Sequence, residues 1–169
     1  MQINIIFYAL LAAVAIITAI KYLSRKKTRH NFRIKQGDSI LKKLNSIDSD
    51  AAKLAYLKKV NPYAFEELLL TALKKHGLKI TRNKRYSGDG GIDGRAKLNG
   101  MPILIQAKRY DGFISKSHVE LFIKTCKDNN CIGFFIHTGK TPSSCFDLVK
   151  GTSVEIISGK KLIELISKV

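Results

Sequence analysis

Acidic residues and cysteines are both scarce in this sequence. It holds 13 Asp+Glu against 30 Lys+Arg in 169 residues, a formal net charge of +17 at pH 7. Such a surplus favours a polyanionic partner, nucleic acid or an anionic membrane surface, although a generally basic protein without one is the plain alternative. The three cysteines, Cys126, Cys131 and Cys145, form no CxxC pair. They indicate reduced thiols in the cytosol rather than a disulfide framework or a zinc site.

Internal repeats, low-complexity tracts and zinc fingers are also absent. A chain of 169 residues has room for one soluble domain and a modest accessory segment, but not for two full enzymatic domains. We divide it into residues 1–23, 24–60 and 61–169.

One long apolar run begins almost at the N-terminus. Residues 3–23 are interrupted only by Asn4, Thr18 and Lys21, and about 20 apolar residues span the ~30 Å hydrocarbon core of a bilayer. The run therefore predicts a transmembrane helix. A cleavable signal peptide is disfavoured because no basic region precedes the run, and a buried core helix is the other alternative.

Basic residues follow the apolar run at once, at Lys21, Arg25, Lys26, Lys27, Arg29 and Arg33. The positive-inside rule then places the short N-terminus outside and the rest of the chain in the cytoplasm, anchored at the inner membrane. Residues 24–60 become a basic juxtamembrane connector, in which N-cap residues at 38–39 and 48–50 predict two small helices. The sequence leaves open whether these form a spacer or pack on the following domain.

The region 61–169 alternates helical and strand patterns. Asn61-Pro62 opens a helix that ends near Gly77, with Glu66 on the flank of its apolar face and Glu67 pointing to water. Further elements are expected at 78–83 (strand), 91–98 and 101–108 (hairpin), 117–128 (helix with a Ser117-x-x-Glu120 capping box), 131–137 (strand), after Pro142 (helix), 154–157 (strand) and from 159 (helix). This order predicts an α/β fold with a mixed sheet and helices on both sides.

The hairpin turns at Asn99-Gly100, which favours a type I′ turn. If Leu98 pairs with Met101, the register continues to Asp93 opposite Gln106. One face is then small and apolar, formed by Ile92, Gly94, Ala96, Ile103, Ile105 and Ala107. The other face carries Asp93, Arg95, Lys97, Gln106 and Lys108, with Leu104 its only apolar member. A carboxylate, an amide and an ammonium thus converge on one side of a rigid scaffold.

This combination suits phosphodiester hydrolysis. Carboxylate and amide oxygens are hard ligands of the kind Mg²⁺ takes, with Mn²⁺ as a substitute, and Lys108 can position a water or stabilise charge that develops on a phosphate. The plain alternative is that Asp93 forms an ordinary surface ion pair with Lys108 or Arg95.

Three segments resemble the Mrr-type restriction endonuclease domain of the PD-(D/E)xK nuclease superfamily. They are Phe65-Glu66, then Gly88-Asp89-Gly90-Gly91-Ile92-Asp93-Gly94, then Ile105-Gln106-Ala107-Lys108-Arg109-Tyr110. The resemblance covers roughly residues 61–169. It implies a restriction-endonuclease-like αβββαβ core, here preceded by the N-terminal transmembrane helix, with DNA as partner and Mg²⁺ as cofactor.

The same resemblance implies roles for single residues. Asp93 would be the principal metal ligand, and Gln106 stands where most of the superfamily has Glu or Asp. Lys108 would be the catalytic lysine, and Glu66 a helix carboxylate on the metal side. Asp89 would be a further acidic contributor. Contacts with nucleic acid are expected from Arg95, Arg109, Lys84 and Arg85.

These observations lead to a membrane-anchored, Mg²⁺-dependent DNA endonuclease that acts in restriction or defence against foreign DNA. Cutting both strands would need two active sites and hence a homodimer. Two other classes stay open: a catalytically inactive, membrane-tethered nucleic-acid-binding protein of the same fold, and a structural membrane adaptor whose basic flank binds lipid.

Overall fold

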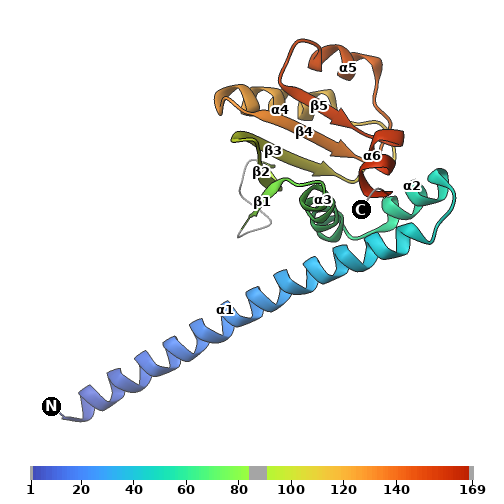
Figure 1. The fold of residues 1–169 in the computed structure, drawn as a ribbon. Coiled ribbons are helices and arrows are strands. Elements are labelled where there is room, and N and C mark those ends of the chain that lie inside the picture. The colour runs from blue at the N-terminus through green and yellow to red at the C-terminus, as the bar shows by residue number, and fades with distance from the viewer. Residues whose placement is uncertain (1, 84–90, 168–169) are drawn as a thin grey trace.

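The computed structural model describes residues 2–83 and 91–167, without the side chains of residues 2–7, 9, 10, 26, 27 and 29. Lys84, Arg85 and Asp89, three of the predicted site residues, lie outside the described residues. The elements follow one another as α1 (Gln2–Asn45), α2 (Asp50–Lys59), α3 (Pro62–Lys75), β1 (Lys79–Arg82), β2 (Gly94–Leu98), β3 (Met101–Lys108), α4 (Lys116–Asp128), β4 (Ile132–His137), α5 (Ser143–Val149), β5 (Val154–Ile157) and α6 (Gly159–Ser167) (Figure 1). From α3 onward this order confirms the prediction.

The strands form one mixed sheet in the order β1-β2-β3-β4-β5. β1, β2 and β3 run antiparallel, and β3, β4 and β5 run parallel. Leu98 pairs with Met101 and Gly94 with Ile105, which confirms the predicted register. The turn places Asn99 at φ 51° and Gly100 at φ 85°, the positive values that a type I′ turn requires.

Local signals also set the bounds of α3. The side chain of Asn61 accepts a hydrogen bond from the Tyr63 N–H, and Pro62 occupies the first turn, where its missing N–H costs nothing. At the other end the chain leaves the helix at Gly77, with φ 90°. The predicted capping box of α4 is wrong: the N-cap is Ser115, whose side chain makes no capping bond to the helix backbone, and Glu120 instead pairs with Lys116 at 3.6 Å.

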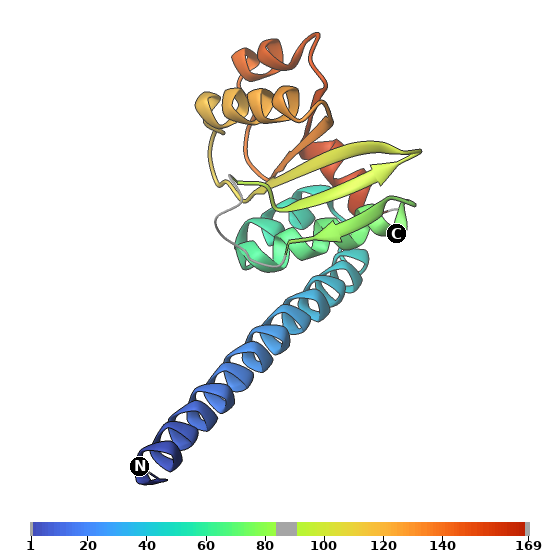
Figure 2. The same cartoon turned by 90° about the vertical axis from the view of Figure 1, so that its left-hand side faces the viewer.

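Helices cover both faces of the sheet (Figures 1 and 2). Parts of α1 and α2, with α3 and α6, pack on one face around a core that includes Phe65, Ile103 and Ile105. On the other face α4 and α5 cover a second core that includes Ile92, Leu104, Val119, Phe122 and Phe135.

The predicted division of the hairpin into an apolar and a polar face is therefore only partly right. Ile92 belongs to the second core together with Leu104, because the regular alternation of β2 starts only at Gly94.

α1 is one continuous helix where two separate elements were expected. Asp38, predicted to cap a new helix, lies inside α1 and pairs with Lys42 at 3.9 Å. Gly37 contacts the backbone of α3 so closely that a Cβ there would lie 2.7 Å from the Leu68 nitrogen. Ile40, Leu41 and Leu44 are buried in the first core, as is Leu57 of α2. This part of the connector therefore packs on the domain and is not a free spacer.

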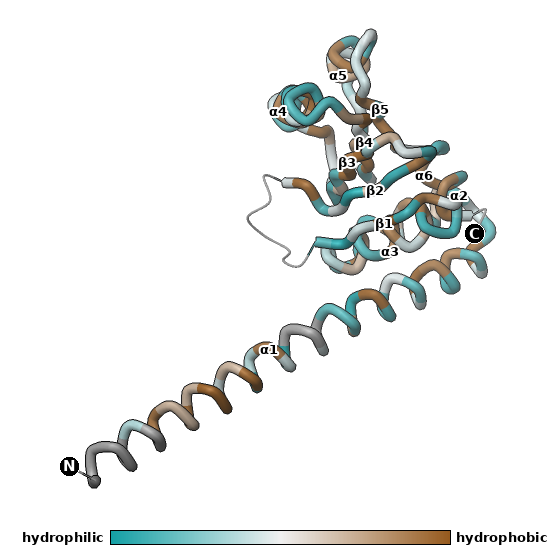
Figure 3. The backbone as a smooth tube through the Cα atoms, turned by 60° about the vertical axis from the view of Figure 1, so that its left-hand side comes forward, coloured by the Kyte–Doolittle hydropathy of each residue, from teal (hydrophilic) through white to brown (hydrophobic). Residues whose placement is uncertain are grey.

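The N-terminal half of α1 extends away from the domain (Figures 1 and 3). Its described large apolar side chains are exposed, among them Leu11, Val14, Ile16, Ile17, Ile20 and Leu23. Within the part of the chain that the structure describes, no helix is long and apolar enough to cross a membrane. The transmembrane helix predicted at 3–23 is thus not supported.

Candidate active site

The predicted residues Glu66, Asp93, Gln106 and Lys108 come together at one end of the sheet. Glu66 projects from α3, Asp93 directly precedes β2, and the other two lie in the last residues of β3. The Asp93 carboxylate raises the pKa of Glu66, and Lys108 lowers the pKa of both carboxyl groups. Three ionisable groups from three elements therefore act on one another directly.

Asp93 is held by backbone groups of β3. Its N–H donates to the Ile105 carbonyl at 2.9 Å, and its Oδ2 accepts from the Ala107 N–H at 2.7 Å. Burial raises the pKa of the carboxyl group to about 6, against the opposing effects of the Ala107 bond and Lys108. The side chain is fixed in direction and partly withdrawn from water.

Glu66 is the more strongly perturbed carboxyl group. Its pKa is raised from 4.5 to about 8, first by burial and then by the carboxylates of Asp93 and Glu67, with Lys108 acting in the opposite direction. Among the described residues, neither the Glu66 nor the Lys108 side chain forms a hydrogen bond or a salt bridge. A carboxyl group with a strongly raised pKa beside a lysine without a bonded partner is typical of a functional site.

The plain alternative of a surface ion pair does not describe Asp93. No salt bridge joins it to Lys108 within the described part of the chain, and the Arg95 guanidinium donates to Asn83 Oδ1 at 3.0 Å instead. Arg95 is exposed, and its contact with nucleic acid stays a prediction.

Gln106 is almost completely buried, with 6% of its surface exposed. Its Nε2 donates to the Gly91 carbonyl at 2.8 Å. Its Oε1 is buried and has no hydrogen-bond partner among the described residues. A buried acceptor of this kind calls for an explanation such as a bound ion.

The donor set fits Mg²⁺. In the described ranges, no group of three or more His, Cys, Asp or Glu side chains is placed to hold a metal ion. Mg²⁺ does not need such a group, because it commonly takes one or two carboxylates and completes its shell with water and substrate phosphate. Asp93 and Glu66 supply the carboxylates and Gln106 Oε1 a neutral oxygen.

Glu67 corrects a prediction. It was expected to face water, but it is only 1% exposed. Its Oε2 pairs with Arg82 Nε at 2.7 Å, and its Oε1 lies 3.7 Å from Nδ1 of His30 in α1. Arg82 also donates to Thr71 Oγ1 at 3.1 Å. The helix periodicity is right about the direction of Glu67, but α1 covers that side of α3, and a buried carboxylate requires a partner there.

Two lysines that the sequence analysis did not single out, Lys58 and Lys59 at the end of α2, lie beside this end of the sheet. The Arg109 guanidinium donates to the Lys58 carbonyl at the end of α2, and Lys58 Nζ donates to the Asp111 carbonyl at 3.1 Å. These bonds hold the last turn of α2, with the exposed Lys59, against the residues that follow Lys108. No local pattern could have revealed the contact, since 51 residues separate Lys58 from Arg109.

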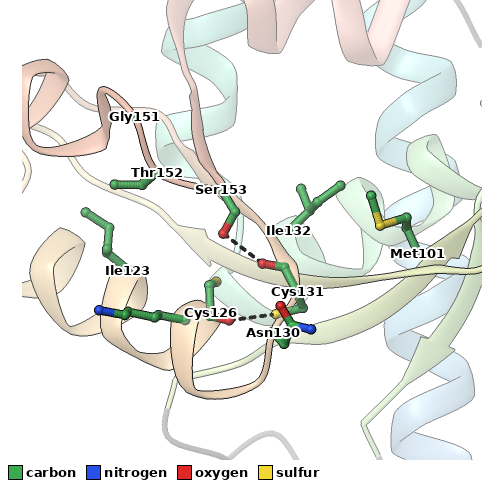
Figure 4. Close-up of a pocket in the computed structure, with 10 residues that line it drawn as sticks. Met101, Ile123, Cys126, Asn130, Cys131, Ile132, Gly151, Thr152 and Ser153 are labelled. Atoms are coloured by element: carbon green, nitrogen blue, oxygen red, sulfur yellow. Dashed lines mark hydrogen bonds between the residues drawn. The ribbon is translucent and has the colours of Figure 1, made fainter.

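A separate hollow of about 580 Å³ lies between α4 and the starts of β4 and β5 (Figure 4). Cys126 and Cys131 line it, and Ser153 Oγ donates to the Cys131 carbonyl at 2.8 Å. Burial raises the pKa of Cys126 to about 12 and that of Cys131 above its usual value. These protonated thiols are not poised as nucleophiles, and the hollow lies at the opposite end of β4 from the residue paired with Lys108.

Comparisons with known proteins identify the family and the fold. A family model described as restriction endonuclease (Mrr_cat) matches residues 57–166, more than half of the chain. A solved structure, "MspJI Restriction Endonuclease in Complex with 27-mer Oligonucleotide", is similar with a TM-score of 0.55 and 23% identity over 71% of this chain. The match spans 34% of that protein's chain, so it supports the fold alone. No curated protein gave a significant match.

Proposed function

This chain belongs to the Mrr-type restriction endonuclease family, and we propose that it is a Mg²⁺-dependent DNA endonuclease that hydrolyses phosphodiester bonds in restriction or defence against foreign DNA. One observation carries the proposal: two carboxyl groups with raised pKa, an unpaired ammonium and a buried, unpartnered amide oxygen meet at one end of the sheet. The net charge of +17 suits a polyanionic substrate.

The chemistry divides among these groups. Asp93, Glu66 and Gln106 Oε1 would hold the cation, which would supply positive charge beside the phosphate and lower the pKa of the attacking water. Lys108 has no competing partner among the described residues. Its ammonium can therefore donate to a phosphate oxygen or orient the water, and its charge offsets the negative charge that develops during hydrolysis.

The test is DNA cleavage by the full chain. Supercoiled plasmid with Mg²⁺ or Mn²⁺ should be nicked or linearised, and Asp93→Ala and Lys108→Ala should each remove this activity. Lys150→Ala is the matched control, because Lys150 pairs with Asp147 on α5, outside the site. If the parent protein does not cut, or if cutting survives both site substitutions, the enzymatic proposal is wrong.

Binding measurements separate the other classes. Salt-sensitive DNA binding without cutting would favour an inactive nucleic-acid-binding protein. Absence of DNA binding would favour the membrane adaptor.

Two further parts of the proposal rest on the sequence alone. Cutting both strands would need two active sites, so we propose a homodimer on duplex DNA, which light scattering with a short duplex would detect. Attachment to the inner membrane, with the nuclease domain in the cytoplasm, remains a prediction from residues 1–33. Recovery of the full chain in the soluble cell fraction would contradict it.

A further inference from the structure

The two ends of the Gln106 amide have different surroundings. Nε2 donates to the Gly91 carbonyl at 2.8 Å, whereas Oε1 is buried without a partner among the described residues. The carbonyl of Gly91 can accept a hydrogen bond but cannot donate one. In this structure the side chain at position 106 supplies the donor, and an ionised carboxylate, the group that most of the superfamily places there, has none.

Gly91 is shaped for this contact. A Cβ on Gly91 would lie 2.5 Å from Gln106 Nε2, and the backbone has φ +83°. Only glycine adopts that conformation readily while letting the amide approach so closely.

Three consecutive residues of β3, at positions 105–107, each form a hydrogen bond with the segment that precedes β2. The Ile105 carbonyl accepts the Asp93 N–H at 2.9 Å, Gln106 Nε2 donates to the Gly91 carbonyl, and the Ala107 N–H donates to Asp93 Oδ2 at 2.7 Å. Two of these bonds act on Asp93 itself, and the third fixes the backbone two residues earlier. Loss of the middle bond would release the backbone at Gly91, two residues before the carboxylate.

We propose that Gln106 is a positioning residue for Asp93: its Nε2 ties down the Gly91 backbone while its Oε1 faces the cation site, and this double task requires an amide and excludes a carboxylate. The part that concerns Oε1 rests on the function proposed above. The part that concerns Nε2 is a property of the fold and is testable without any DNA.

The main test is Gln106→Glu, which keeps an acceptor but removes the donor at neutral pH. We expect the metal-free full chain to lose roughly 3–8 °C of Tm at pH 8, because the buried side chain at position 106 loses its hydrogen bond and carries an uncompensated charge.

Divalent binding and cutting complete the test. An added carboxylate that acted only as a ligand would tighten Ca²⁺ binding in calorimetry and preserve cutting. We expect Ca²⁺ affinity no higher than that of the parent and cutting at least tenfold slower. An unchanged Tm at pH 8, or tighter Ca²⁺ binding with full cutting, would each overturn the proposal.

Gly91→Ala disturbs the same hydrogen bond at its acceptor residue, because the added Cβ would lie 2.5 Å from Gln106 Nε2. This variant should also cut DNA at least tenfold more slowly. Gly77→Ala is its matched control, since Gly77 has φ +90° but open space around the added Cβ. The control shares the backbone strain but should cut like the parent, and equal loss in both variants would refute the role of the Gly91–Gln106 bond.

The two proposals can fail separately. If the parent does not cut DNA, the Tm and Ca²⁺ measurements still decide the role of Nε2. If Asp93→Ala abolishes cutting while Gln106→Glu behaves like the parent, the nuclease assignment stands and the positioning role is refuted.

Discussion

Glu66 and Glu67 are neighbours in α3, yet replacing them by glutamine should change stability in opposite directions. The Glu66 side chain has no hydrogen bond or salt bridge among the described residues, and its pKa is raised from 4.5 to about 8, mainly by burial. Glu67 is 1% exposed and pairs with Arg82 at 2.7 Å. Glu66→Gln removes an unfavourable buried charge, whereas Glu67→Gln leaves the Arg82 guanidinium without its carboxylate.

The pKa of Glu66 determines both sign and magnitude. The folded protein keeps this proton up to pH about 8, while the unfolded chain releases it near 4.5. The free energy of unfolding therefore falls as pH rises between these values. At 1.36 kcal/mol per pKa unit the full effect would be roughly 5 kcal/mol, and solvent screening of a partly exposed group leaves about 2 kcal/mol. We expect Glu66→Gln to stabilise the metal-free protein by about that much at pH 8.5 and hardly at all at pH 5.

Glu67→Gln should destabilise the protein at pH 8.5 by about 1–3 kcal/mol, because the partly buried Arg82 guanidinium loses its carboxylate and a neutral amide compensates the charge only in part. Urea unfolding followed by circular dichroism, in EDTA at pH 5 and pH 8.5, measures both variants. Glu66→Gln should at the same time cut DNA at least tenfold more slowly. Destabilisation by Glu66→Gln at pH 8.5, or a shift of the same sign in both variants, would show that the reasoning about the site is wrong.

Three further predictions concern proton release on Mg²⁺ binding, contacts with DNA phosphates and the packing of α1 against α3. Mg²⁺ binding should release protons at pH 7, and the affinity for Mg²⁺ should rise up to about pH 8, because the cation displaces protons held by Glu66 and Asp93. Calorimetry in two buffers of different ionisation enthalpy counts the released protons, and a count of zero would contradict the prediction. Lys59→Gln should reduce by about 1 the magnitude of the slope of log K for DNA binding against log salt concentration. Lys150→Gln should leave this slope unchanged. Gly37→Ala should lower Tm by several degrees, since a Cβ would lie 2.7 Å from the α3 backbone; an unchanged Tm would show that α1 does not cross α3 there.

Local chemistry in the sequence determined the elements that build the site. Asn99-Gly100 is sufficient to set the turn and register of the hairpin, because both central positions need positive φ and side chains alternate along each strand. Asn61-Pro62 and Gly77 likewise set the ends of α3. These signals act within a few residues, so the order of elements and the convergence of Asp93, Gln106 and Lys108 could be predicted from the chain alone.

Only the tertiary structure decided what covers these elements. Glu67 points away from the apolar face of α3 as its helical position requires, but α1 lies over it, and Arg82 supplies the charge that makes its burial tolerable. The contact between Lys58 and Arg109, and the donor bond from Gln106 to Gly91, likewise join residues that are distant in sequence. Local patterns specify which way a side chain points, whereas its solvation, and hence its pKa and its role, depends on segments that fold against it from elsewhere in the chain.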